Sequence, residues 1–186
     1  MLWGGVADGG GLELRRLSTG GARLTGRFPY GVPAEIGRGR VEVIASRAFA
    51  ARIEAGEDVH LLSGHDFEKP LASRAAGTLD LRDGDDALVI EATISADTTW
   101  ARDFLAAHDA GLIKGLSPGF RVTPNGERIE ARGGEVRRTI TAADLFEVST
   151  VTRPAYGEAQ ITARNWSPRH EAPDAGMQRA LKRWRA

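Results

Sequence analysis

Glycine and proline interrupt this chain so often that it is limited to short secondary-structure elements. The 186 residues include 23 glycines and 8 prolines, which mark turns and the ends of helices and strands. Many segments between these interruptions carry alternating or continuous apolar residues, as strands do. Clear examples are residues 22–28, 58–62, 87–95 and 145–151. We expect about nine short strands in total, with two or three helices between them.

Three segments are predicted to be helical. Ser46 is a candidate N-cap for a helix over residues 47–55, before Gly56. Thr98 or Thr99 caps a longer helix that runs to about residue 110. A short amphipathic helix is expected over residues 176–184. The glycine-rich stretch 30–39 is predicted to form a loop.

The order of these elements predicts a mainly β (α+β) fold. The helices do not alternate regularly with the strands, which argues against a doubly wound parallel sheet. An antiparallel β-barrel flanked by a few helices fits better. We expect residues 1–161 to form one domain, with 1–10 loose. Residues 162–186 are expected to form a basic, partly disordered tail with a short helix.

Composition excludes several classes of protein. The chain has no cysteine, which excludes disulfides and thiolate metal sites. Lysine plus arginine equals aspartate plus glutamate at 25 each, so the basic excess of a nucleic-acid-binding domain is missing. No apolar run has the length of a membrane span, and the N-terminus does not resemble a signal peptide. We therefore expect a cytoplasmic protein with neither a nucleic acid nor a membrane as partner.

The four histidines differ in how well their positions suit catalysis. His60 lies within an apolar run and is expected to be a packed strand residue, and His108 lies on the predicted helix. His170 falls in the tail. His65 follows a buried strand and a glycine, at a strand end where its side chain can enter a cleft. His65 is therefore the best candidate for a catalytic base.

A serine pattern invites comparison with the α/β-hydrolases. Residues 115–119, Gly-Leu-Ser-Pro-Gly, match the G-x-S-x-G nucleophile elbow around Ser117. An elbow needs a strand before the serine and a helix after it, whereas here a predicted helix precedes and a predicted strand follows. The elbow's triad order would also require Asp144 and then His170 from the tail. The α/β-hydrolase interpretation is therefore set aside.

A metal site is also possible in principle. The available ligands are His60, His65, Asp66, His108 and Glu147. They include neither the i, i+4 histidine pair of a helical zinc site nor another known ligand spacing. We expect no bound metal.

Three segments taken together resemble the prohead protease family of tailed phages, including the versions encoded by gene transfer agents. They are residues 61–66 (LLSGHD), 111–120 (GLIKGLSPGF) and 145–155 (LFEVSTVTRPA). They occur in the family's order and at its spacing, and the resemblance spans about residues 22–161. It implies that the 1–161 unit is a protease domain with a herpesvirus-protease-like fold.

The resemblance also implies the catalytic residues. Ser117 is expected to be the nucleophile and His65 its base. Glu147 is expected to be the third member, where the herpesvirus proteases have a second histidine. Ser149 shares a strand face with Glu147 and is expected to be structural.

The donors for the oxyanion stay open. Backbone amides or an arginine can serve, and the candidates are Gly119, Phe120, Arg121 and Arg153.

The resemblance also implies a serine endopeptidase that removes the scaffolding segment of the major capsid protein, and usually cleaves itself, inside the assembling prohead in the host cytoplasm. The major capsid protein is the expected substrate, a second copy of the chain is a further partner through dimerisation, and no cofactor is expected. The alternative is a non-catalytic capsid-assembly or scaffolding protein with the same fold. Loss of the serine or the histidine would mark that alternative, and both are present.

Overall fold

Strands dominate the protein, as the sequence predicts. The computed structural model describes residues 11–18 and 20–152. The strands are β1 (Gly11–Arg16), β2 (Ala22–Pro29), β3 (Ala34–Gly37), β4 (Arg40–Ile44), β5 (His60–Ser63), β6 (Asp66–Ser73), β7 (Leu79–Asp83), β8 (Ala87–Ile94), β9 (Gly115–Val122), β10 (Glu127–Arg132), β11 (Glu135–Ile140) and β12 (Ala143–Val151). The helices are α1 (Ala50–Glu54) and α2 (Thr99–Asp109).

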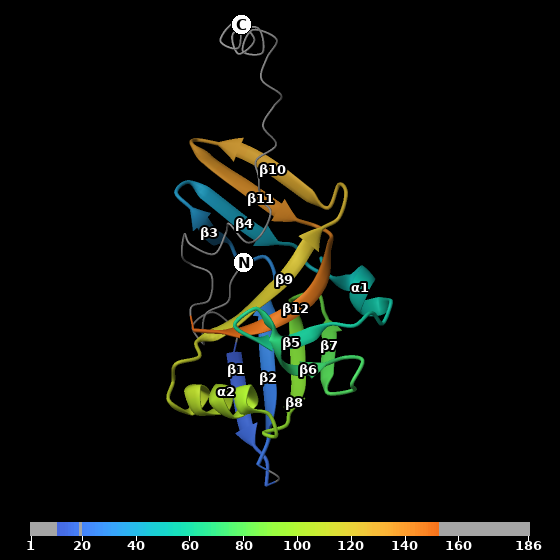
Figure 1. Ribbon diagram of the computed structural model, residues 1–186. Helices are drawn as coiled ribbons and strands as arrows, with labels where there is room; N and C mark the ends of the chain where they lie inside the picture. Colours follow the sequence, from blue (N-terminus) through green and yellow to red (C-terminus); the bar gives the residue numbers. More distant parts are fainter. Residues whose placement is uncertain (1–10, 19, 153–186) are drawn as a thin grey trace, which may run out of the picture.

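The strands form three four-stranded sheets rather than one barrel. We call them the N-terminal sheet (β1-β2-β8-β7), the distal sheet (β10-β11-β4-β3) and the central sheet (β6-β5-β12-β9). Most pairs are antiparallel, but β4 pairs with β11 and β5 with β12 in parallel. The N-terminal and distal sheets lie at opposite ends of the molecule, and the long strands β9 and β12 cross between them (Figure 1).

The expectation of a closed antiparallel barrel is therefore wrong for the part of the chain that the structure describes. A barrel needs its first and last strands to pair, whereas each of the three sheets ends in two edge strands. Local patterning predicts that strands form, about nine here against the twelve found among the described residues, but not which distant strands pair. The mainly β class itself is confirmed.

One hydrophobic core joins the three sheets. Phe28 and Ile90 of the N-terminal sheet, Ile140 of the distal sheet and Leu116 of the central sheet are all fully or almost fully buried within it. Gly26 on β2 permits the close approach of two of the sheets, because a Cβ there would lie 2.3 Å from Leu116 Cδ1. The residue next to the candidate nucleophile is thus fixed by inter-sheet packing.

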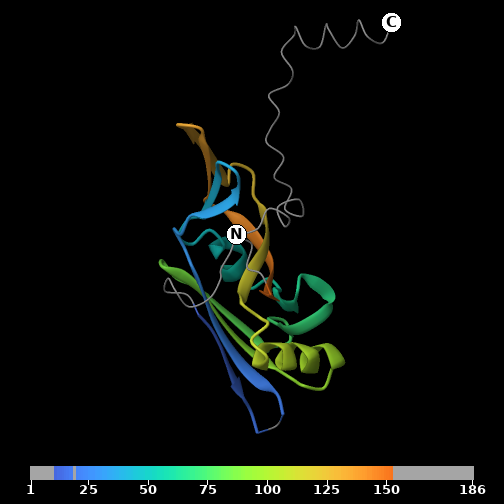
Figure 2. The ribbon, with the colours of Figure 1, turned by 90° about the vertical axis from the view of Figure 1, so that its left-hand side faces the viewer.

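Helix α2 covers the core beside the central sheet. Its N-cap is Thr98, whose hydroxyl accepts a hydrogen bond from the Ala101 amide, as the sequence predicts. The indole of Trp100 donates a 2.8 Å hydrogen bond to the carbonyl of Pro70 on β6. Figure 2 shows α2 on the same side of the N-terminal sheet as β5 and β6. Among the described residues, no helix is long and apolar enough to span a membrane.

Three local predictions are wrong for identifiable reasons. The predicted loop 30–39 contains the four-residue edge strand β3. The sequence does not predict strand β6, because its residues 67–70 are exposed and include Pro70, which an edge strand tolerates. Helix α1 begins at Ala50 and has no side-chain cap, because Arg47 has a left-handed φ of 54° that separates Ser46 from the helix.

The expected loose segment 1–10, the tail 162–186 and the helix 176–184 lie outside the described residues.

Candidate active site

Strand β12 is the centre of the candidate site because both of its neighbours carry candidate residues. Glu147 lies opposite His60 on the parallel strand β5 and opposite Gly119 on the antiparallel strand β9. Two residues further along β12, Ser149 lies opposite Ser117 on β9. Because alternate residues of a strand point to the same face, Glu147 and Ser149 share a face.

A tight turn brings His65 to this face. Ser63 pairs with Asp66, so Gly64 and His65 form the two-residue connection between β5 and β6. Their φ angles are 66° and 65°, and positive φ at both central residues is the mark of a type I′ hairpin turn. The Gly64 amide donates a 3.0 Å hydrogen bond to the Thr150 carbonyl, which ties the turn to β12. A left-handed histidine is costly for the backbone and often occurs at functional sites.

His65 and Glu147 form the central hydrogen bond of the site. His65 Nδ1 lies 2.8 Å from Glu147 Oε1. A carboxylate only accepts hydrogen bonds, so this contact assigns the proton to Nδ1 and leaves the lone pair on Nε2. The Glu147 side chain is 6% exposed and that of His65 is 33% exposed. The pair thus combines a buried acid with an imidazole that solvent reaches.

The acid beside His65 is Glu147 and not the adjacent Asp66. Asp66 accepts hydrogen bonds from the Glu68 amide at 2.9 Å and pairs with Lys69 Nζ at 3.0 Å. These contacts lower the pKa of Asp66, with the Lys69 hydrogen bond as the largest cause.

Ser117 lies on the same sheet, one strand away from Ser149. Side chains directly opposite on antiparallel strands have Cβ atoms about 4.5–5.5 Å apart, so Ser117 lies close to the His65 turn, which Ser149 contacts. Ser117 is also fully buried. Acyl transfer at Ser117 would therefore require its hydroxyl to become exposed to substrate.

Gly119 makes room for the Glu147 carboxylate. A Cβ at position 119 would lie 1.9 Å from Glu147 Oε1, the oxygen that contacts His65. No side chain larger than hydrogen fits while the carboxylate keeps its place. The second glycine of the G-x-S-x-G segment therefore has a steric reason that is unrelated to a nucleophile elbow.

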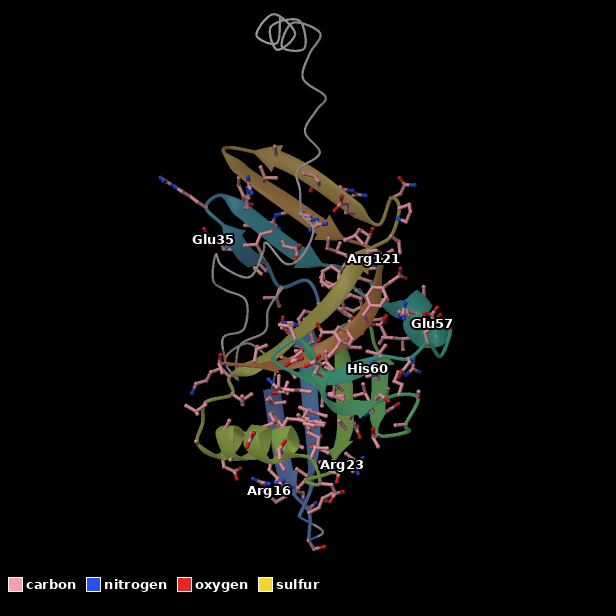
Figure 3. All side chains as sticks on the ribbon, in the orientation of Figure 1. Arg16, Arg23, Glu35, Glu57, His60 and Arg121 are labelled. Atoms are coloured by element: carbon pink, nitrogen blue, oxygen red, sulfur yellow. The ribbon has the colours of Figure 1, made fainter. Side chains whose placement is uncertain are left out.

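A bulge on β12 brings a second side chain beside Glu147. The register between β12 and β9 shifts between Leu145 and Glu147, so Phe146 is the extra residue. Phe146 and Glu147 both line a cavity of about 450 Å³, together with His60, Phe67 and other residues. The guanidinium of Arg52 stacks on the Phe146 ring at 4.3 Å, and that of Arg121 lies at 5.3 Å. Figure 3 shows His60 and Arg121 on either side of this region.

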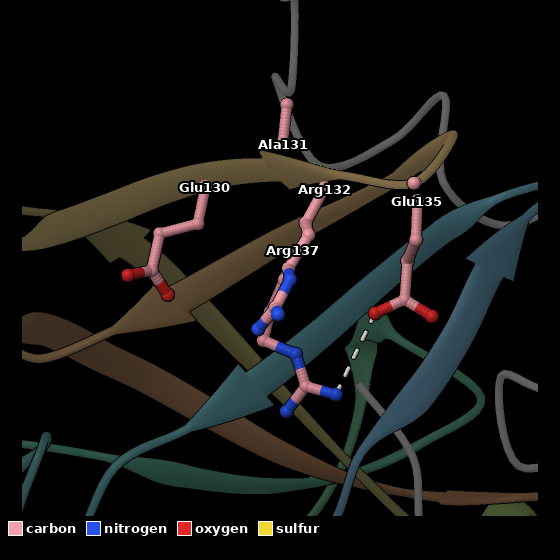
Figure 4. Close-up of a pocket in the computed structure, with 6 residues that line it drawn as sticks. Glu130, Ala131, Arg132, Glu135 and Arg137 are labelled. Carbon is pink, nitrogen blue, oxygen red and sulfur yellow. Dashed lines mark ion pairs between the residues drawn. The ribbon is translucent and has the colours of Figure 1, made fainter.

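A larger hollow lies elsewhere and contains none of the candidate residues. It is lined by residues of the β10–β11 hairpin, among them Glu130, Arg132, Glu135 and Arg137 (Figure 4). Arg137 Nη2 lies 3.5 Å from Glu135 Oε1. This hollow belongs to the distal sheet, and neither His65 nor Glu147 is among its lining residues.

The other histidines have partners different from those of His65. His108 lies on α2 and His60 pairs with Asp58 at 3.5 Å. Ser117 lies within strand β9, without the strand–turn–helix context of a nucleophile elbow. The described residues include no group of three or more metal-ligating side chains. His170 and the possible oxyanion donor Arg153 lie outside the described residues.

Two details of the candidate site could not be predicted from sequence spacing. The spacing Glu147-x-Ser149 placed both residues on one face, but not the hydrogen bonds that join them to His65. The role of Gly119 depends on the pairing of β9 with β12, which β10 and β11 separate in the sequence.

One family matches most of the chain. The model of the caudovirus prohead serine protease family matches residues 28–172. No curated protein and no solved structure matches the chain significantly.

Proposed function

Since this chain belongs to the caudovirus prohead serine protease family, we propose that it is a serine endopeptidase that removes the scaffolding segment of the major capsid protein. The family supports the class of enzyme, the capsid-protein substrate and action inside the assembling prohead. The observation that carries the proposal for this chain is the 2.8 Å contact between His65 Nδ1 and Glu147 Oε1. It orients an imidazole that lies across strand β12 from Ser117.

In the proposed reaction, Ser117 Oγ attacks the carbonyl carbon of the scissile peptide bond. His65 Nε2 takes the hydroxyl proton and then gives it to the leaving amine, while Glu147 holds Nδ1–H and stabilises the imidazolium. Water, with its proton taken by His65, then hydrolyses the acyl-enzyme and regenerates Ser117. The transfer needs Ser117 Oγ and His65 Nε2 within about 2.6–3.2 Å, so the buried serine must first become accessible.

The oxyanion of the tetrahedral intermediate needs hydrogen-bond donors. The backbone amides of Gly119 and Phe120 lie on the strand that carries Ser117, and Arg121 follows them. Arg121 stacks on Phe146, so we favour the amides over this guanidinium.

The test is co-expression with the cognate major capsid protein, followed by intact mass spectrometry. We expect a defined N-terminal truncation of the capsid protein with the wild type and full-length capsid protein with Ser117→Ala. Ser18→Ala, at an exposed serine on the loop after β1, is the control and should cleave normally. Full-length capsid protein with every variant, in shells that still assemble, would favour the non-catalytic assembly role.

A further inference from the structure

The Ser149 side chain forms hydrogen bonds with both His65 and Glu147. Its hydroxyl donates a 2.6 Å hydrogen bond to Glu147 Oε2 and accepts a 2.9 Å hydrogen bond from the His65 backbone amide. It is fully buried, so water does not compete for either bond. A small hydroxyl thus joins the catalytic acid to the turn that carries the base.

The two hydrogen bonds have separate consequences. The bond to Oε2 leaves Oε1 directed at His65 Nδ1, so the carboxylate cannot rotate without breaking a buried contact. The bond from the His65 amide fixes the left-handed residue of the hairpin turn. Together the two bonds hold His65 at two points. One fixes its backbone, and the other fixes the carboxylate that contacts its ring nitrogen.

We propose that Ser149 is a positioning residue for the His65–Glu147 pair, a role that rests on the proposed function. Its hydroxyl does not attack substrate, because its proton is donated to Glu147 and Ser117 is the serine of the expected nucleophile motif. Its effect on cleavage acts through His65, which loses its orientation when the hydroxyl is removed. Misplacement of a catalytic group by about 1 Å can reduce a rate by about 100-fold.

The next residue on the strand offers a matched control. Thr150 is also almost fully buried, and its hydroxyl donates a 3.3 Å hydrogen bond to the Leu62 carbonyl. Because neighbouring strand residues point to opposite faces, this hydroxyl touches neither His65 nor Glu147. Thr150→Val removes a buried hydroxyl of β12 without disturbing the proposed positioning.

The experiment compares Ser149→Thr with Ser149→Val, which have nearly the same size and differ in the hydroxyl. We expect Ser149→Val to lower kcat about 10–100-fold below Ser149→Thr, with KM little changed. Thr150→Val should keep the wild-type kcat. Equal kcat for Ser149→Thr and Ser149→Val, with both folded, would overturn the proposal.

A second readout does not depend on cleavage. The Nδ1–H proton of His65, held by Glu147, should give a far-downfield NMR resonance in the full-length protein, assigned by its loss in His65→Gly. We expect it to persist in Ser149→Thr and Thr150→Val and to shift or exchange away in Ser149→Val. A resonance unchanged in Ser149→Val would contradict the positioning role. Absence of cleavage by the wild type, with this pattern intact, would instead count against the proposed function.

Discussion

Two carboxylates of this protein are buried to the same extent but have very different hydrogen-bond partners. Glu42 on β4 of the distal sheet and Glu147 on β12 of the central sheet are each 4% exposed. Glu42 accepts a 3.1 Å hydrogen bond from Arg138 Nη1, and the same guanidinium donates through Nε to Glu127 at 2.6 Å. Glu147 is instead bonded to an imidazole and to a serine hydroxyl.

The difference lies in what the partner can do. Arginine keeps its proton at any pH a protein tolerates, so the cluster of Arg138, Glu42 and Glu127 can only hold the distal strands together. An imidazole exchanges its proton near neutral pH, and His65 is held by one nitrogen on a turn with left-handed backbone. Burial of a carboxylate therefore does not identify a catalytic group. The chemistry and exposure of its partner distinguish Glu147 from Glu42.

The largest expected effect separates activity from stability at the central sheet. His65→Gly removes the proposed base and should lower cleavage by about 10⁴-fold or more. Glycine also relieves the left-handed backbone at this position, which offsets the lost contact with Glu147. We expect the free energy of unfolding to stay within about 1 kcal/mol of the wild type. Cleavage assays and urea unfolding measure the two quantities, and residual cleavage at a tenth of the wild-type rate would exclude His65 as the base.

Glu147→Gln should have the next largest effect on cleavage. The amide keeps the size of the side chain but can present its NH₂ group to His65 and favour the wrong tautomer. We expect kcat to fall about 10³–10⁴-fold with a small residual rate. Single-turnover cleavage of a capsid-derived peptide would measure it. A loss of less than tenfold would make Glu147 a structural residue like Glu42.

Arg138→Met should have the opposite profile. Removing the guanidinium leaves Glu42 and Glu127 without this partner, and breaking a buried ion pair in this way costs about 3–5 kcal/mol. We expect the free energy of unfolding to fall by that amount, while cleavage per folded molecule stays normal. The double variant with Glu42→Leu should recover part of the stability. A selective loss of cleavage in folded Arg138→Met would contradict a purely structural role for the Arg138 cluster.

Gly119→Ala tests the space that the Glu147 carboxylate occupies. The added Cβ would overlap Oε1, so the carboxylate must move and cleavage should fall about 10–100-fold. Gly37→Ala is the matched control, because that strand glycine has only Arg40 Cδ near its Cβ position, at 3.8 Å. Kinetic assays on both variants measure the effect. Equal activities would show that the carboxylate adjusts without cost.

The smallest effect concerns a third polar pair, between the Tyr30 hydroxyl and Asp83. Burial is the largest cause that raises the pKa of Asp83. The folded protein therefore holds this proton more tightly than the unfolded chain, and the contribution of Asp83 to stability falls as pH rises above about 4. Asp83→Asn should remove this pH dependence, which is about 1 kcal/mol or less for a half-exposed group. Urea unfolding at several pH values measures it, and an unchanged pH dependence would contradict the assignment.

Local sequence determined much of the secondary structure. The alternation in residues 22–28 and 87–95 produced β2 and β8, and Thr98 began α2 where its capping chemistry indicates. Strand β6 is not predicted from the sequence because Lys69 and Pro70 break the apolar pattern. The strand tolerates them because it lies at the edge of its sheet. The motifs around His65, Ser117 and Glu147 placed the chain in its family, because side-chain chemistry at fixed spacing is a local property.

Tertiary structure decided which of these residues meet. Glu147 contacts His65 because β5 and β12 pair in parallel although more than 80 residues separate the two side chains. The same pairing gives Ser149 its two hydrogen bonds, and the register between β9 and β12 places Gly119 under the carboxylate. The division into three sheets instead of a barrel was decided in the same way. Strand pairing depends on contacts between distant segments, and these are set by the packing of the whole chain rather than by any one segment.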